Sequence, residues 1–238
     1  MALSESQIAG LIDHTLLKPE ASRDDIRKLC EEALEFGFAS VCVNPWNVPL
    51  AAELLRGSAV KVCTVAGFPL GATFPEVKVF EAQGSLALGA QEIDMVINLG
   101  ALKSGQVDVL EKDIQGVVRT AHQAGGICKV ILETALLTRE EKIQASLAAM
   151  KAGADFVKTS TGFASGGATP EDVRLIQETI GPGHGIKAAG GVRTLADLQK
   201  MVEAGATRIG ASAGVKIMEQ ARSGASSSFL PGSDSAKY

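Results

Sequence analysis

The chain has 238 residues, of which 46% are hydrophobic and 21% are charged, and its formal net charge is −4. A chain of this length supports one large domain or two small ones. The lack of a basic cluster argues against a nucleic-acid partner, and the short apolar runs argue against a membrane protein. The first residues lack the basic region and apolar core of a secretion signal, so we expect a cytoplasmic protein.

The cysteines and histidines do not form a metal-binding pattern. No two cysteines have the C-x-x-C spacing, and the three histidines are far apart in the sequence. Three of the four cysteines lie in strand-like runs, where cysteine is usually a small buried hydrophobe. We therefore expect reduced thiols and no bound metal.

One type of helix-to-strand connection recurs along the chain. A helical stretch ends in a glycine, and a strand-like run begins about four residues later, at Gly37, Gly89, Gly153 and Gly205. Glycine supplies the left-handed residue that ends a helix, after which the chain turns into the next strand. Repetition of this helix-to-strand connection predicts repeated αβ units.

Eight strands are predicted, over residues 11–14, 41–44, 62–65, 93–98, 130–133, 156–159, 185–188 and 208–211. Helices between them have start signals at Ser22, Pro75, Thr138, Thr169 and Thr194. The apolar periodicity predicts that these helices pack against the sheet through faces that include Val77, Phe80 and Leu147.

Eight alternating units predict a single (β/α)8 TIM barrel over residues 1–222, and a doubly wound open sheet is the alternative. From Ser223 the periodicity ends and serine, glycine and alanine prevail. Residues 223–238 are therefore predicted to be a flexible C-terminal tail, which ends at Tyr238, the only tyrosine.

Lys158 is the first candidate catalytic residue, because it ends an apolar run and a Ser/Thr/Gly loop follows it. A strand that is covered on both faces has little room for an ammonium group, so a buried lysine finds a partner or loses its proton. A neutral lysine amine can form a Schiff base with a carbonyl substrate. The alternative is a lysine with a buried stem whose head reaches water at the strand end.

Lys187 occupies the matching place near the end of the next predicted strand. Burial and like charge both lower the pKa of an ammonium group, so two adjacent lysines favour one neutral nucleophile beside a cation. Asp94 shares a strand face with Val96 and Asn98, and an inward lysine is its expected partner, in a proton relay or in a purely structural ion pair. We expect Lys129 and Glu133 to share a strand face and to support the site, with Lys129 as a possible relay.

Three loops have the small residues that bring backbone N–H groups close to a phosphate. They follow predicted strands six, seven and eight, and the candidate residues are Thr161, Gly162, Gly190, Gly191, Gly210 and Ser212. In a (β/α)8 barrel, the loops after strands seven and eight often bind phosphate.

These motifs resemble the deoxyribose-phosphate aldolase family. The resemblance extends from residue 12 to about residue 217 and includes residues 12–18, 40–45, 92–98, 129–134, 158–162, 190–194 and 210–212. It implies a (β/α)8 barrel and a class I aldolase without metal or cofactor. The implied reaction is reversible cleavage of 2-deoxy-D-ribose 5-phosphate to D-glyceraldehyde 3-phosphate and acetaldehyde, so the implied partners are small molecules, and a homo-oligomer is possible.

The resemblance also implies residue roles. The Schiff-base lysine falls on Lys158, the second lysine on Lys187 and the relay aspartate on Asp94. Tyr238 matches, by position only, a terminal tyrosine that helps the acetaldehyde proton step in some members, and it is a possible relay. Two positions depart from the family pattern. Phe163 stands where some members have a lysine, and Ala213 stands where others have a serine, so two potential phosphate contacts are absent.

Two other functions remain open at this stage. One is a different Schiff-base aldolase or a transaldolase that acts on another sugar phosphate. The other is a barrel that binds a phosphate ligand without catalysis.

Overall fold

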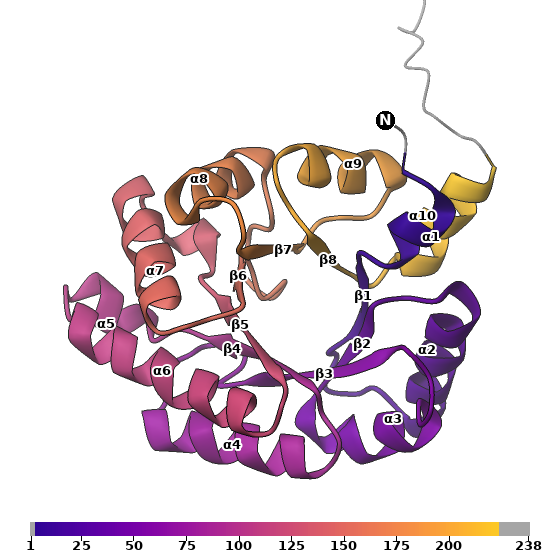
Figure 1. Cartoon of the computed structure of the whole chain (residues 1–238), viewed down its shortest axis with the longest axis horizontal. Coiled ribbons are helices and arrows are strands. Elements are labelled where there is room, and N and C mark those ends of the chain that lie inside the picture. Colours follow the sequence, from indigo (N-terminus) through magenta and orange to yellow (C-terminus); the bar gives the residue numbers. More distant parts are fainter. Residues whose placement is uncertain (1–2, 224–238) are drawn as a thin grey trace, which may run out of the picture.

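The computed structural model describes residues 3–223 and shows eight parallel strands that close into a barrel (Figure 1). The strands are β1 (Ile12–Leu16), β2 (Ser40–Val43), β3 (Lys61–Ala66), β4 (Glu92–Val96), β5 (Ile127–Ile131), β6 (Phe156–Lys158), β7 (Gly185–Ala189) and β8 (Arg208–Ala211). Each strand pairs with the next in the chain, and β1 also pairs with β8, with Ile12 opposite Ile209. This closure confirms the predicted TIM barrel and excludes the open sheet.

Helices surround the barrel (Figure 1). They are α1 (Glu5–Ala9), α2 (Arg23–Phe36), α3 (Val48–Leu54), α4 (Pro75–Ala87), α5 (Leu99–Lys103), α6 (Val107–Gln123), α7 (Arg139–Lys151), α8 (Pro170–Ile180), α9 (Leu195–Glu203) and α10 (Gly214–Arg222), with short 3₁₀ turns η1 (Pro45–Asn47) and η2 (Thr134–Leu136). The predicted starts are confirmed. Ser22, Thr138 and Thr194 form capping boxes, whereas Pro75 and Pro170 open their helices.

The strands separate two environments. Outward residues such as Ile93 and Met95 are fully buried in the apolar layer between the sheet and the helices. Asp94 lies between them in the sequence and faces the opposite way, into the barrel. The barrel interior therefore holds charged side chains within a shell of packed hydrocarbon.

Two helices do not bury the faces that apolar periodicity predicted. On α4, Val77 and Phe80 are exposed and Lys78 is fully buried, where it contacts Asp113 of α6 at 2.6 Å. On α7, Leu147 is exposed, and small residues face the sheet instead. A buried ion pair and close helix packing override the periodicity at these two helices.

Two strand ends were predicted too far along the chain. β4 ends at Val96, and Asn98 instead caps α5 by accepting a hydrogen bond from the Ala101 N–H. β5 ends at Ile131, and Glu133 has a left-handed backbone with φ of 58°. The predictions that Asn98 shares a strand face with Asp94 and that Glu133 shares one with Lys129 are therefore wrong.

Within residues 3–223, the structure contains no helix with the length and hydropathy of a transmembrane span. Residues 224–238, with Tyr238 at their end, lie outside the described part of the chain.

Candidate active site

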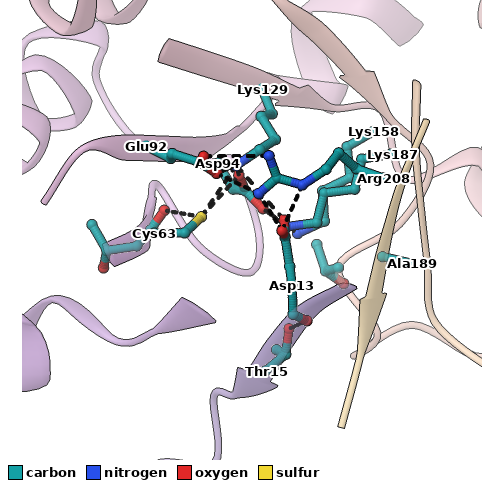
Figure 2. A network of polar contacts seen from close by, with 12 residues as sticks. Asp13, Thr15, Cys63, Glu92, Asp94, Lys129, Lys158, Lys187, Ala189 and Arg208 are labelled. Atoms are coloured by element: carbon teal, nitrogen blue, oxygen red, sulfur yellow. Dashed lines mark hydrogen bonds and ion pairs between the residues drawn. The ribbon is translucent and has the colours of Figure 1, made fainter. Parts of the chain in front are cut away.

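Three predicted catalytic residues meet inside the barrel. Lys158 is the last residue of β6 and pairs in register with Lys187 of β7. The Asp94 Oδ2 atom, from β4, accepts hydrogen bonds from Lys158 Nζ at 2.8 Å and Lys187 Nζ at 2.6 Å (Figure 2). All three side chains are almost completely buried.

A wider charge network surrounds this centre. Lys129 Nζ donates to Asp94 Oδ1 at 2.8 Å and pairs with Glu92 at 2.6 Å. Lys187 Nζ also lies 2.5 Å from Asp13 Oδ2, and Arg208 joins Asp13 to Glu92 (Figure 2). Lys129 thus lies beside Asp94, as a relay would require, although its role remains a prediction.

The network is nearly balanced in charge. Among the described residues, three carboxylates (Asp13, Glu92 and Asp94) face three cations (Lys129, Lys187 and Arg208) through direct ion pairs. Lys158 is the additional amine. Within residues 3–223, its only ion-pair contact is with Asp94, which two other lysines share. Among the three buried lysines of the network, Lys158 therefore has the fewest ion-pair partners.

The electrostatics keep the supporting groups charged. Burial alone would lower the pKa of Lys187, but Asp13 and Asp94 outweigh burial and raise it. Burial would likewise raise the pKa of Asp94, but Lys129, Lys158 and Lys187 hold it well below its usual range. Lys187 is therefore an ammonium group and Asp94 a carboxylate at neutral pH.

The buried carboxylates predict a loss of stability in acid. Burial would raise the pKa of Asp13 and of Asp94, but neighbouring cations lower both below the ordinary 3.8. The unfolded chain therefore binds these protons more tightly, so the stabilisation is complete above pH 3.8 and declines as the pH falls through the lowered values. We expect the urea concentration at the unfolding midpoint to decrease as the pH falls below about 4. In Asp13→Asn the urea midpoint should depend less steeply on pH in this range. An unchanged slope of midpoint against pH would contradict the stabilising role of the Asp13 carboxylate.

A pocket of about 300 Å³ opens above Lys158. Its lining includes every predicted phosphate-binding residue: Thr161, Gly162, Gly190, Gly191, Gly210 and Ser212. Gly162, Gly190 and Gly191 all have positive φ, which lets these loops turn back over the strand ends. One pocket therefore joins the Lys158 amine to the three small-residue loops.

Two cations at the pocket mouth were not assigned a role from the sequence. Lys18 follows β1 and Arg193 follows β7, and both line the pocket while remaining exposed to solvent. The pocket also reaches Ser212, just before α10, and no side chain within the described residues caps the N-terminus of α10. Uncapped N–H groups and nearby cations favour an anion here. Phe163 also lines the pocket and packs edge-on against Phe68.

Glu133 supports the loop that follows β6. Its buried carboxylate accepts hydrogen bonds from the Thr161 backbone N–H at 3.3 Å and from the Thr161 hydroxyl. The Thr161 hydroxyl oxygen in turn accepts a hydrogen bond from the Phe163 N–H. Glu133 therefore reaches the site through a loop contact and not through a shared strand face with Lys129.

Two sets of side chains bring potential metal ligands together: Cys42, Cys63 and Asp94, and Asp13, Cys63 and Glu92. Within each set the ligand atoms lie within 4.8 Å of one another. The three carboxylates already pair with buried lysine or arginine cations, whose charge opposes a further cation at either set.

Asp13, Glu92 and Arg208 also belong to the charge network, although none of them was predicted from the sequence to be part of the site. Each is a charged residue in a strand of the barrel, which is the signal that singled out Asp94. Arg208 and Asp13 are 195 residues apart in the sequence, so their pairing becomes visible only when the barrel closes.

Comparisons with known proteins agree with this geometry. A family model described as DeoC/LacD family aldolase matches residues 8–227. Deoxyribose-phosphate aldolase of Clostridium perfringens is 59% identical over 217 residues, which cover 91% of this chain and 96% of that protein. The enzyme of the same name from Streptococcus gordonii is 62% identical over 208 residues, covering 87% and 94%.

A solved structure of a deoxyribose phosphate aldolase is also similar to this chain. The deoxyribose phosphate aldolase of Aeropyrum pernix, described as a unique tetramer, superposes with a TM-score of 0.87 at 38% identity and covers 92% of this chain and 93% of that one. The match therefore extends over nearly the whole barrel in both sequence and structure. This chain belongs to the DeoC/LacD family of aldolases.

Proposed function

We propose that this chain is a class I aldolase that reversibly cleaves 2-deoxy-D-ribose 5-phosphate to D-glyceraldehyde 3-phosphate and acetaldehyde. The observation that carries the proposal is the Lys158 amine at the base of the pocket, 2.8 Å from a carboxylate that it shares with the Lys187 ammonium group. A lysine amine held in this way can form an iminium ion with an aldehyde.

The proposed reaction begins when Lys158 Nζ attacks C1 of the open-chain sugar and water leaves, which produces an iminium ion. The C2–C3 bond then breaks, its electrons form the C1=C2 enamine, and the C3 hydroxyl loses its proton as C3 becomes the new aldehyde. After glyceraldehyde 3-phosphate leaves, C2 takes up a proton. Water then hydrolyses the iminium ion and releases acetaldehyde.

Asp94 and Lys187 have complementary roles in this scheme. The Asp94 carboxylate stabilises the cationic iminium and orients the Lys158 nitrogen through the 2.8 Å contact. Because its pKa lies well below the usual range, Asp94 is an anion when the substrate binds, and its carboxylate is the proposed acceptor of the C3 hydroxyl proton through water. Lys187, an ammonium group that donates to the same carboxylate oxygen, is the proposed source of the proton that C2 takes up, and the proton held by Asp94 then restores Lys187.

The small-residue loops support a phosphorylated substrate. Gly190, Gly191, Gly210 and Ser212 line the same pocket as Arg193, and Lys18 contributes a second positive charge to its lining. These cations offset the absence of a lysine at position 163, where the pocket instead has the phenyl ring of Phe163. We propose that this part of the pocket binds the 5-phosphate.

Replacing Lys18 by alanine tests the phosphate assignment. We expect KM for 2-deoxyribose 5-phosphate to rise about tenfold, equivalent to roughly 1.4 kcal/mol of lost binding. The KM for unphosphorylated 2-deoxyribose should not change, because that sugar lacks the anion. Steady-state kinetics with both sugars measure this, and Lys200→Ala, on the exposed face of α9, is the matched control. Equal effects on both sugars would contradict the role of Lys18.

Borohydride trapping tests the proposed chemistry directly. Incubation with acetaldehyde and borohydride should leave a reduced two-carbon adduct on Lys158, located by peptide mass spectrometry. Product analysis with 2-deoxyribose 5-phosphate and with fructose phosphates then identifies the substrate. A folded protein without an adduct on Lys158 would refute Schiff-base chemistry at this site, and cleavage of fructose phosphates alone would refute the substrate.

A further inference from the structure

His14 is a buried histidine that the proposed reaction does not use. It lies on β1 next to Asp13, but its side chain points away from the barrel interior, where it contacts Glu32 of α2 and approaches Gly214 of α10. Only 3% of its surface is exposed. A polar ring that is packed between three elements is held in one place, so its contacts determine how those elements meet.

Glu32 fixes the orientation of the His14 ring. The His14 Nε2 atom lies 2.7 Å from the Glu32 Oε2 atom. A carboxylate only accepts hydrogen bonds, so Nε2 carries the N–H and the second ring nitrogen, Nδ1, has a lone pair. Within residues 3–223, His14 Nδ1 is buried and has no hydrogen-bond partner. The contact with Glu32 therefore determines which edge of the ring faces α10.

The first turn of α10 packs against the Nδ1 edge of this ring. A Cβ atom added at Gly214, the first residue of α10, would lie 2.8 Å from His14 Nδ1 and 3.1 Å from Phe38 Cζ. A contact of 2.8 Å is too short for a side-chain carbon, so this approach of the helix requires glycine. The Nδ1 lone pair also faces the positive end of the helix dipole, which is a favourable arrangement.

A column of rings extends from His14 along α10, which lies beside α2 in the ring of helices (Figure 1). The His14 and Phe38 ring centroids are 5.0 Å apart, and Phe38 stacks on Phe36 at 5.5 Å. Arg222, the last residue of α10, lies 4.6 Å from the centroid of the Phe36 ring. The column therefore contacts α10 at both ends, at Gly214 and at Arg222, and limits how far the helix can shift.

The position of α10 matters because its first turn adjoins the pocket. His14 lies opposite Ala211 in the register of β1 and β8, and Ala211 and Ser212 line the pocket just before α10 begins. Within the described residues, no side chain caps the N–H groups of that turn. Hydrogen bonds from such N–H groups to an anion weaken steeply with distance, so a small shift of the helix changes phosphate affinity.

We propose that His14, oriented by Glu32, is a positioning residue that holds the first turn of α10 at the distance from which its N–H groups bind the 5-phosphate of the substrate. His14 does not line the pocket, so it acts through α10 and not by contact with the sugar. The inference rests on the proposed function, because it concerns the phosphate end of the same substrate.

Replacing His14 by leucine keeps much of the side-chain volume and removes both ring nitrogens. We expect KM for 2-deoxyribose 5-phosphate to rise about tenfold with kcat within about twofold, because phosphate binding is lost equally from the ground state and the transition state. The KM for unphosphorylated 2-deoxyribose should not change. His122→Leu, which removes a histidine paired with Asp155 at 2.8 Å on α6, is the matched control. Equal effects of His14→Leu on the two sugars would overturn the proposal.

Variants of Glu32 test the orientation without changing the ring. The Glu32 side chain is 25% exposed, so its replacement disturbs folding less than a change at His14 does. Glu32→Met removes the acceptor, and KM for 2-deoxyribose 5-phosphate should rise about threefold. Glu32→Gln still offers an oxygen to Nε2 and should restore the parent KM. A glutamine variant as impaired as the methionine variant would contradict positioning through this hydrogen bond.

Gly214→Ala tests the close approach of α10. The added Cβ should displace the first turn and raise KM for 2-deoxyribose 5-phosphate, whereas Gly84→Ala on α4, where a Cβ meets no heavy atom within 4 Å, should not. In a His14→Ser background the ring is absent, so the same Gly214→Ala change should raise KM by a smaller factor. An equal factor in both backgrounds would show that His14 does not set the position of α10 and would overturn the proposal.

Two further measurements separate this inference from the proposed function. In a phosphorus NMR titration, inorganic phosphate should bind the parent protein about tenfold more tightly than it binds His14→Leu, whichever sugar the enzyme cleaves. Borohydride trapping of acetaldehyde on Lys158 should be the same in both proteins. An absent adduct in the parent would refute the Schiff-base chemistry alone, whereas equal phosphate binding by the two proteins would refute the role of His14.

Discussion

Replacement of Lys158 by leucine is expected to abolish cleavage of 2-deoxyribose 5-phosphate, with kcat lowered by about 10⁴-fold or more. Leucine fills much of the same buried space but has no amine, so no iminium ion can form. The three remaining cations, Lys129, Lys187 and Arg208, still match the three carboxylates of the network, so the fold should persist. A coupled assay for glyceraldehyde 3-phosphate measures the loss.

A binding measurement separates lost chemistry from lost structure. Lys158→Leu should still bind glyceraldehyde 3-phosphate, since the loops at Gly190 and Ser212 and the cation of Lys18 are unchanged. Calorimetry should therefore give a Kd close to that of the parent protein. Lys200→Leu, at an exposed position on α9, should retain both activity and binding. Measurable turnover by Lys158→Leu would refute its role as the nucleophile.

The barrel was predictable because its signals are local. The glycine that ends α2 is Gly37, which has a left-handed backbone, and the capping boxes at Ser22, Thr138 and Thr194 involve residues only three positions apart. Such features depend on backbone geometry within one turn, so the sequence reveals them directly. Eight repetitions then leave few topologies to consider.

The orientation of α4 was not predictable from periodicity. Apolar spacing identifies one face of a helix but does not say what covers that face. On α4 the apolar residues Val77 and Phe80 are exposed, because Lys78 turns inward to Asp113 and to the Val96 carbonyl oxygen at 2.9 Å. That burial depends on a carboxylate 35 residues away, which no local pattern reveals.

The site itself was partly predictable. Lys158, Lys187 and Asp94 are charged residues in apolar strands, and the fold directs strand ends toward one face, so their convergence followed from topology. Asp13 and Arg208 have the same character, but their ion pair joins the first strand to the last. Their contribution to the charge balance requires the register of the closed barrel.

Replacement of Asp94 by asparagine is expected to reduce kcat by about 10²–10⁴-fold and to destabilise the fold by about 3–5 kcal/mol. The substitution removes the charge that both oxygens of Asp94 present to Lys129, Lys158 and Lys187. Lys129 keeps Glu92 and Lys187 keeps Asp13, but Lys158 loses its only ion-pair partner within residues 3–223. The nucleophile should therefore lose its orientation more than the other two lysines do.

A second buried ion pair provides the control for this effect. Asp113→Asn removes a carboxylate that is equally buried and lies 2.6 Å from Lys78, between α4 and α6 and away from the pocket. We expect a comparable loss of stability, on the order of 3 kcal/mol by urea unfolding, with kcat within about twofold of the parent value. If Asp113→Asn lost as much activity as Asp94→Asn under conditions where both are folded, the role of Asp94 would reduce to stabilising the barrel. A selective loss in Asp94→Asn would place its charge in the reaction, because burial and substitution are the same at both positions.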